Sequence, residues 1–137
     1  MKKTIAILII CFCSEFLFAQ NHFKFHAFGI RFGKFDYLRK RWKIDDNYSV
    51  IDAGIVCTPK KVAIATKTTG EIYTIVRLNQ KDTYTDKDVQ CLSMDATTEN
   101  KKDCKIKLIV FSNDDAHTVI EIIRNGRLTE YISNNVN

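Results

Sequence analysis

The chain has 137 residues, of which 45% are hydrophobic and 27% charged, and its net charge is +5. This length is enough for one domain with its own core. The positive charge is mild and lacks the dense basic stripe of a dedicated nucleic-acid binder, so we expect no nucleic-acid partner.

The N-terminus has the layout of a secretory signal peptide. A positive start at Lys2 and Lys3 precedes an apolar run, residues 5–12, and Ala19 ends a cleavage motif of suitable type. The apolar run is too short for a comfortable membrane span, and Glu15 prevents its extension toward Ala19. We therefore expect an exported protein that does not span a membrane.

In this interpretation residues 1–19 are a signal peptide of bacterial type and residues 20–137 form a single β domain. The protein is then secreted or periplasmic and meets an oxidising compartment. Residues 8–11 loosely resemble a lipoprotein box, but Ile10 stands before Cys11 where such boxes carry a small residue. A lipid anchor is therefore not our expectation.

Phenylalanines crowd the start of the expected mature chain, at Phe23, Phe25, Phe28, Phe32 and Phe35. Their alternation changes phase near residues 27–28, which predicts a bulge there or a bend at Gly29. We expect one or two strands that close the sheet, because an uncovered edge this apolar would aggregate. An exposed aromatic surface for a partner or ligand is the alternative.

The most basic stretch of the chain comes next, and aromatic residues stand within it. Basic side chains interleaved with aromatic ones can bind a phosphorylated or sulfated polymer through charge and stacking. The same residues also suit a solvated turn with one tryptophan in the core. The candidate binding residues are Tyr37, Arg39, Lys40, Arg41 and Trp42.

The rest of the chain alternates short β-branched and aromatic runs with turn residues, which is typical of an antiparallel all-β domain. The expected strands are residues 49–57, 61–66, 71–78, 88–94, 104–111, 118–124 and 128–132. Asn125-Gly126 between the last two predicts a tight hairpin. We expect a long polar connection over 95–103, fraying over 133–137, and a meander that forms a curved sheet or small barrel.

Three cysteines lie outside the leader, and an odd number in an exported protein indicates one disulfide with a spare thiol, or an intermolecular bridge. Cys91 and Cys104 flank the 95–103 connection and are the favoured pair, because hairpins bring Cα atoms close together. Cys57 is then the spare thiol. Strand parity puts Cys91 and Cys104 on opposite faces, so a Cys57–Cys104 pair stays open.

No set of residues indicates catalysis or a metal site. His22 and His26 share a strand face but lie about 13 Å apart in an extended chain. Asp82, Asp86 and Asp88 lack the glycine and the closing glutamate of a calcium loop. No cysteine has an activating histidine nearby in the sequence. We expect a protein that is not an enzyme, with no catalytic residue, metal or cofactor.

A resemblance to known proteins rests on several segments, which are the run Pro59-Lys60-Lys61-Val62-Ala63-Ile64-Ala65-Thr66-Lys67, the strand 71–77 and the two cysteine-bearing strands. From about Trp42 to Tyr131 the chain resembles small exported bacterial β-rich proteins. The long insertion between Cys91 and Cys104 departs from their pattern. The resemblance implies a β fold and export, and it transfers no catalytic residue.

Together these features favour an exported, non-catalytic binding or interaction module. Its partner would be an unknown protein, an anionic polymer or a small apolar ligand. One alternative is a small lipocalin-like barrel with an apolar ligand, for which eight short strands leave little room. Another is an inhibitory or structural partner of a second exported protein, docked through an edge strand.

Overall fold

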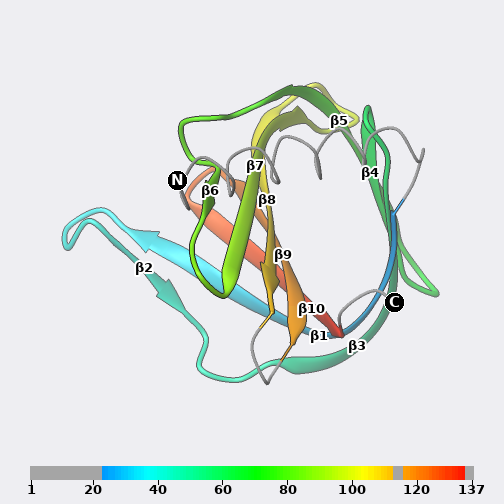
Figure 1. The fold of residues 1–137 in the computed structure, drawn as a ribbon, viewed down its shortest axis with the longest axis horizontal. Coiled ribbons are helices and arrows are strands. Elements are labelled where there is room, and N and C mark those ends of the chain that lie inside the picture. Colours follow the sequence, from blue (N-terminus) through cyan, green and yellow to red (C-terminus); the bar gives the residue numbers. More distant parts are fainter. Residues whose placement is uncertain (1–22, 113–115, 135–137) are drawn as a thin grey trace.

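A computed structural model of the chain describes residues 23–112 and 116–134 (Figure 1). Antiparallel strands make up its regular structure. The strands are β1 (Phe23–Asp36), β2 (Arg41–Ile44), β3 (Ser49–Cys57), β4 (Lys61–Ala65), β5 (Gly70–Leu78), β6 (Tyr84–Thr85), β7 (Val89–Thr97), β8 (Asp103–Phe111), β9 (His117–Arg124) and β10 (Arg127–Asn134). Within these two ranges there is no helix long and apolar enough to cross a membrane. The expected signal peptide lies outside the described residues.

Eight of the strands close into a barrel, because β1 pairs with β10 as well as with β3. The order around the barrel is β1-β3-β4-β5-β7-β8-β9-β10, and every neighbouring pair is antiparallel. β2 pairs with the last four residues of β1, outside the barrel. β6 pairs with the part of β7 that β5 leaves free. The predicted all-β meander is confirmed, in the form of a closed barrel.

A bulge in β1 allows this strand to close the barrel. Its register shifts between Ala27 and Gly29 on both of its edges, where the phenylalanine alternation changes phase. Glycine is needed here, since a Cβ at Gly29 would lie 2.7 Å from the Ile132 side chain. Phe25 points into the barrel and is buried, whereas Phe28 and Phe32 are 45% and 52% exposed. The predicted bulge is confirmed, and burial holds for only part of the aromatic segment.

The apolar core fills the inside of the barrel. Side chains alternate between the two faces of each strand, and closure turns one of these faces inward. All eight barrel strands contribute to the buried cluster, which is Phe25, Ala27, Ala53, Ile55, Val62, Ile64, Tyr73, Met94, Ala96, Cys104, Ile106, Leu108, Ile120, Ile122 and Tyr131. The alternating apolar residues of the sequence therefore form one contiguous core.

A row of charged side chains crosses the outer face of β1, β10, β9 and β8. The Arg31 guanidinium lies 2.8 Å from Glu130, whose side chain is 5% exposed, and the Tyr48 hydroxyl donates to the same carboxylate. Glu121 lies opposite Glu130, and Lys107 lies opposite Glu121. Burial raises the pKa of Glu121, and the nearby Glu130 charge raises it further. The row therefore fastens the closing strands and holds two facing carboxylates.

The β7–β8 connection is shorter than predicted. The expected loop 95–103 is reduced to residues 98–102, because Asp95 pairs with Lys105 and Thr97 with Asp103 in the ladder. These polar side chains lie on the outer face of the strands, where each is at least partly exposed to solvent. At the other end of the chain, β10 continues to Asn134 and only residues 135–137 of the expected frayed segment fall outside the described residues.

The predicted Cys91–Cys104 disulfide is wrong. Cys91 lies opposite Ile109 and Cys104 opposite Ala96, five positions apart in the ladder and on opposite faces. Five residues of strand span about 17 Å, far beyond the reach of a disulfide. Cys57, Cys91 and Cys104 are all free thiols, so the Cys57–Cys104 alternative is not formed either.

Candidate functional site

Three turns and the β1–β2 hairpin gather at one end of the barrel, which we call the barrel mouth. The turns join β4 to β5, β7 to β8 and β9 to β10. A pocket of about 310 Å³ opens between the three turns. Its lining includes Glu71, Tyr73, Glu99, Asn100, Lys102 and Arg124. Polar and charged groups therefore meet at the place where the apolar interior ends.

Four cations face one another across four strands at the rim of this mouth. Lys43 on β2 lies opposite Lys34 on β1, Lys34 lies opposite Arg127 on β10, and Arg127 lies opposite Arg124 on β9. We call these four residues the cation row. Directly opposite residues have Cβ atoms about 5 Å apart, so the row is about 15 Å long. All four are exposed, and within residues 23–112 and 116–134 none forms an ion pair.

The cation row stands on the strand face that lines the barrel. On β10, Arg127 has the same parity as Tyr131, which is buried in the core. On β1, Lys34 has the same parity as Ile30, which packs against that core. The cations therefore stand at the rim of the interior, and Arg124 belongs to both the row and the pocket.

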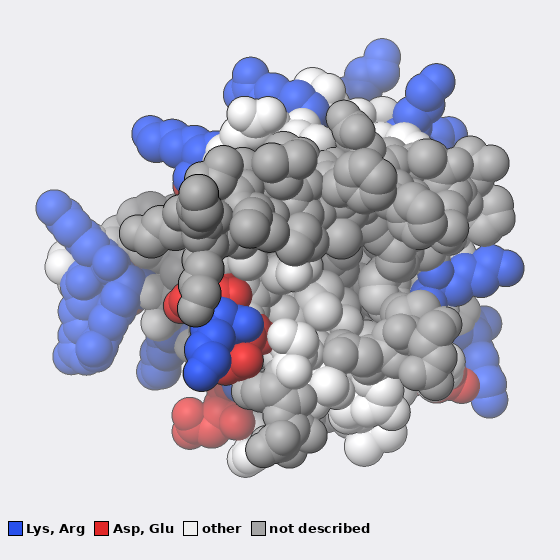
Figure 2. Space-filling view, viewed as in Figure 1, with Lys and Arg blue, Asp and Glu red and all other residues white. Residues whose placement is uncertain are grey.

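The predicted binding residues lie beside this row, in a hairpin that projects from the barrel (Figure 1). Asp36 shapes its turn by accepting hydrogen bonds from the backbone N–H groups of Leu38 and Arg39, at 3.0 and 3.2 Å. Lys40 adopts a φ of 52°, which completes the reversal. Figure 2 shows lysine and arginine side chains gathered over this hairpin. The structure thus brings Arg39, Lys40 and Arg41 close to the cation row.

The two predicted aromatic residues do not face the cations. Phe35 makes edge-to-face contacts with Tyr37 and Trp42, at ring-centre distances of 5.0 and 5.2 Å. Trp42 lies opposite Phe35 in the ladder, so both occupy the strand face turned away from Lys34. The expectation that the tryptophan lies in the core is wrong: Trp42 is half-buried and packs within the hairpin. These rings stiffen the hairpin and are not placed for stacking on a ligand of the cation row.

The Tyr73 phenol and the Glu71 carboxylate lie where the pocket meets the core, and the Tyr131 phenol lies within the core. The Tyr73 hydroxyl donates a hydrogen bond to Glu71. Burial raises the pKa of Tyr73, and the Glu71 hydrogen bond and charge add to the effect. Burial also raises the pKa of Tyr131 to about 12. Both phenols therefore stay protonated at neutral pH, when the pocket combines carboxylates, cations and neutral hydrogen-bonding groups.

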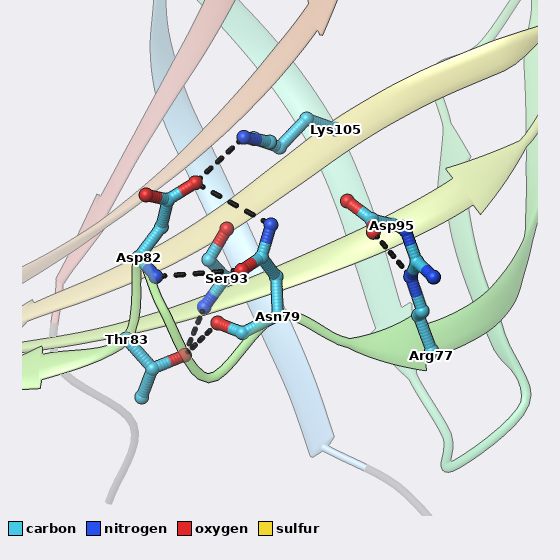
Figure 3. A network of polar contacts seen from close by, with 7 residues as sticks. All are labelled: Arg77, Asn79, Asp82, Thr83, Ser93, Asp95 and Lys105. Atoms are coloured by element: carbon cyan, nitrogen blue, oxygen red, sulfur yellow. Dashed lines mark hydrogen bonds and ion pairs between the residues drawn. The ribbon is translucent and has the colours of Figure 1, made fainter.

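The acidic loop before β7 serves as a structural clasp (Figure 3). The Asp82 carboxylate lies 2.7 Å from the Lys105 ammonium and 3.4 Å from the Asn79 side-chain nitrogen. The hydrogen bond and charge of Lys105 hold the pKa of Asp82 below its ordinary value. The Thr83 hydroxyl accepts a 3.1 Å hydrogen bond from the Ser93 backbone N–H. These contacts fasten the loop to the outside of β7 and β8, and Asp82 is paired with a cation of the chain itself.

One of the two histidines considered above lies in the described part of the chain. His26 is exposed and contacts Asp52 on the neighbouring strand β3, while His22 lies outside the described residues. In the part of the chain that the structure describes, no three His, Cys, Asp or Glu side chains are grouped as metal ligands.

The sequence interpretation missed the four members of the cation row, although one clue was present. The Asn125-Gly126 turn fixes Arg124 opposite Arg127, since a two-residue hairpin pairs the residues that flank it. Nothing local places Lys34 beside Arg127, because their contact depends on barrel closure.

No family model matches the chain, and no curated protein or solved structure matches it. The chemistry of the barrel mouth is therefore the basis for a functional assignment.

Proposed function

We propose that the protein is an exported, non-catalytic binding module whose barrel mouth binds an anionic polymer. The observation that carries this proposal is the cation row. Like charges directly opposite each other destabilise a sheet. An anion lying across the row would relieve that repulsion, so binding and fold stability are coupled at this site.

The length of the row favours a polymer over a single anion. Its members recur at the strand spacing of about 4.8 Å, so they match a partner with regularly spaced negative groups. Arg39, Lys40 and Arg41, which are exposed in the hairpin, add positive charge beside the row. Attraction of this kind weakens with added salt, because exposed charges are screened.

A charge-reversal experiment tests the proposal. Purified protein is passed over immobilised dextran sulfate at low ionic strength and eluted with a salt gradient. We expect the unaltered protein to be retained and the double variant Lys34→Glu/Arg127→Glu to flow through. The matched control, Lys60→Glu/Lys61→Glu, carries the same charge change at exposed positions near the opposite end of the barrel. Equal retention of the two double variants would contradict the proposal.

The closed barrel supports a second candidate, a lipocalin-like barrel that holds a small apolar ligand. A barrel of eight strands is just wide enough for its side chains or for one small ligand. Here the large side chains Ile55, Ile106 and Ile120 are fully buried in the barrel. Because they occupy interior space that a ligand would need, this candidate ranks second. A native mass spectrum separates the two: a copurifying small apolar molecule supports the second candidate, and the mass of the chain alone supports the first.

A further inference from the structure

We infer that the pocket of the barrel mouth seats a sugar unit, which makes the polymer an acidic polysaccharide. This inference rests on the proposed function and specifies the chemistry of its ligand. It depends on the mixed lining of the pocket and on the continuity between the pocket and the cation row.

The lining of the pocket is unsuited to a ligand that is only negative. Glu71 and Glu99 present carboxylates beside Lys102 and Arg124. A chain of phosphates would meet repulsion from both carboxylates, whereas sugar hydroxyls can donate to carboxylates and accept from cations. The Asn100 amide offers both a donor and an acceptor to the same hydroxyls. A ligand with hydroxyl groups as well as charges therefore satisfies more of this lining.

The size and walls of the pocket fit a small ring. Its volume of about 310 Å³ lies at the lower limit of small-molecule sites. Ile72, which is 43% exposed, supplies an apolar patch beside the polar groups. A sugar ring likewise combines apolar C–H faces with polar edges. The Tyr73 ring is only 6% exposed and is engaged with Glu71, so it offers no open stacking platform for a nucleic-acid base.

Arg124 links the pocket to the row. It lines the pocket and also lies opposite Arg127, at the end of the cation row. A polysaccharide with one unit in the pocket would continue over Arg127 and Lys34, where successive strands present cations about 4.8 Å apart. The pocket then binds neutral groups of the polymer, and the cations along the rim bind its negative charges.

The test compares two probes, polygalacturonate and inorganic polyphosphate, by isothermal titration at equal concentrations of negative charge. We expect polygalacturonate to bind at least about tenfold more tightly. Asn100→Trp, placed in the exposed β7–β8 turn, should block the pocket and weaken polygalacturonate about tenfold without changing polyphosphate binding. The matched control, Gln80→Trp, adds the same side chain to an exposed turn at the other end of the barrel and should change neither.

The possible results separate this inference from the proposed function. Equal binding of both probes, or an Asn100→Trp variant that loses both equally, would overturn the sugar pocket. If Lys34→Glu/Arg127→Glu then still abolishes both interactions, the proposed function stands without the inference. If that variant binds both probes normally, the proposed function fails as well. Asn100→Ala guards against a folding defect: it should weaken polygalacturonate alone, by less than the tryptophan variant, with an unchanged melting temperature.

Discussion

Lys34 on β1 lies directly opposite Arg127 on β10, in the last cross-strand pair of the ladder that closes the barrel. Lys43 lies on the other side of Lys34 in the same row. A lysine between two cations has unfavourable neighbours in both directions, and no acidic partner among the described residues offsets them. The fold therefore gives up stability at the position where we propose that the ligand binds.

Neutralising this lysine should stabilise the protein. We expect Lys34→Gln to raise the free energy of unfolding by about 0.2–1 kcal/mol in urea denaturation at low salt. The gain should vanish in 1 M salt, where the screening length falls to about 3 Å. Lys61→Gln is the control, because Lys61 lies opposite the uncharged Thr74. A Lys34→Gln variant that is less stable than the unaltered protein at low salt would contradict this account.

The buried ion pair on the outer face predicts a loss of stability. Arg31→Met leaves the Glu130 carboxylate buried without its cation, and we expect the free energy of unfolding to fall by about 3 kcal/mol. Replacing both partners, in Arg31→Met/Glu130→Leu, should recover most of that loss, since no buried charge then remains. The measurement is the urea midpoint of each variant.

An exposed pair provides the comparison. Arg77 contacts Asp95 at 2.7 Å, but the arginine side chain is 76% exposed. Arg77→Met should therefore change the free energy of unfolding by less than about 1 kcal/mol. If Arg77→Met costs as much free energy of unfolding as Arg31→Met, burial does not determine how much these two ion pairs contribute to stability.

The strand content was predictable because it depends on local alternation. The strand expected at residues 49–57 is β3 itself, and the Asn125-Gly126 hairpin has the positive φ angles, 52° and 70°, that its turn requires. The phase change near Ala27 also predicted the bulge in β1. In each case the controlling interactions lie within a few residues of one another.

The features that were missed depend on register between distant residues. The polarity of residues 95–103 predicts a loop, yet Asp95 lies on the outer face of β7 and pairs with Lys105 in the ladder. The closeness of Cys91 and Cys104 in the sequence predicts a disulfide, yet the ladder offsets them by five positions. The cation row needs the pairing of Lys34 with Arg127, which no local pattern encodes.

The cysteines predict a protein without an internal disulfide. In protein that lacks residues 1–19, the intact mass should be the same before and after reduction, because Cys57, Cys91 and Cys104 are free. Burial raises the pKa of each thiol, that of Cys57 to about 12, and the thiolate is the reactive form. A thiol reagent should therefore label the folded protein slowly and the urea-unfolded protein quickly at all three positions. A mass that rises by two hydrogens on reduction would contradict this arrangement.

The facing carboxylates on the outer wall predict a pH-dependent stability. Burial and then the charge of Glu130 raise the pKa of Glu121 above its ordinary 4.5, against the opposing effects of Lys107 and Arg31. Between pH 4.5 and the pKa of Glu121 in the folded protein, this carboxyl is mostly ionised in the unfolded chain but mostly protonated in the folded chain. The stability associated with protonated Glu121 is therefore complete below pH 4.5 and is lost as the pH rises.

Glu121→Gln removes this titration, so its effect should depend on pH. We expect the variant to melt at a higher temperature than the unaltered protein at pH 7, and the difference to disappear below pH 4.5, where both side chains are neutral. Exposed Glu99→Gln is the control and should leave the melting temperature unchanged at both pH values. A difference for Glu121→Gln that stays constant with pH would mean that the amide packs better, and that the partly buried charge of Glu121 is not the cause.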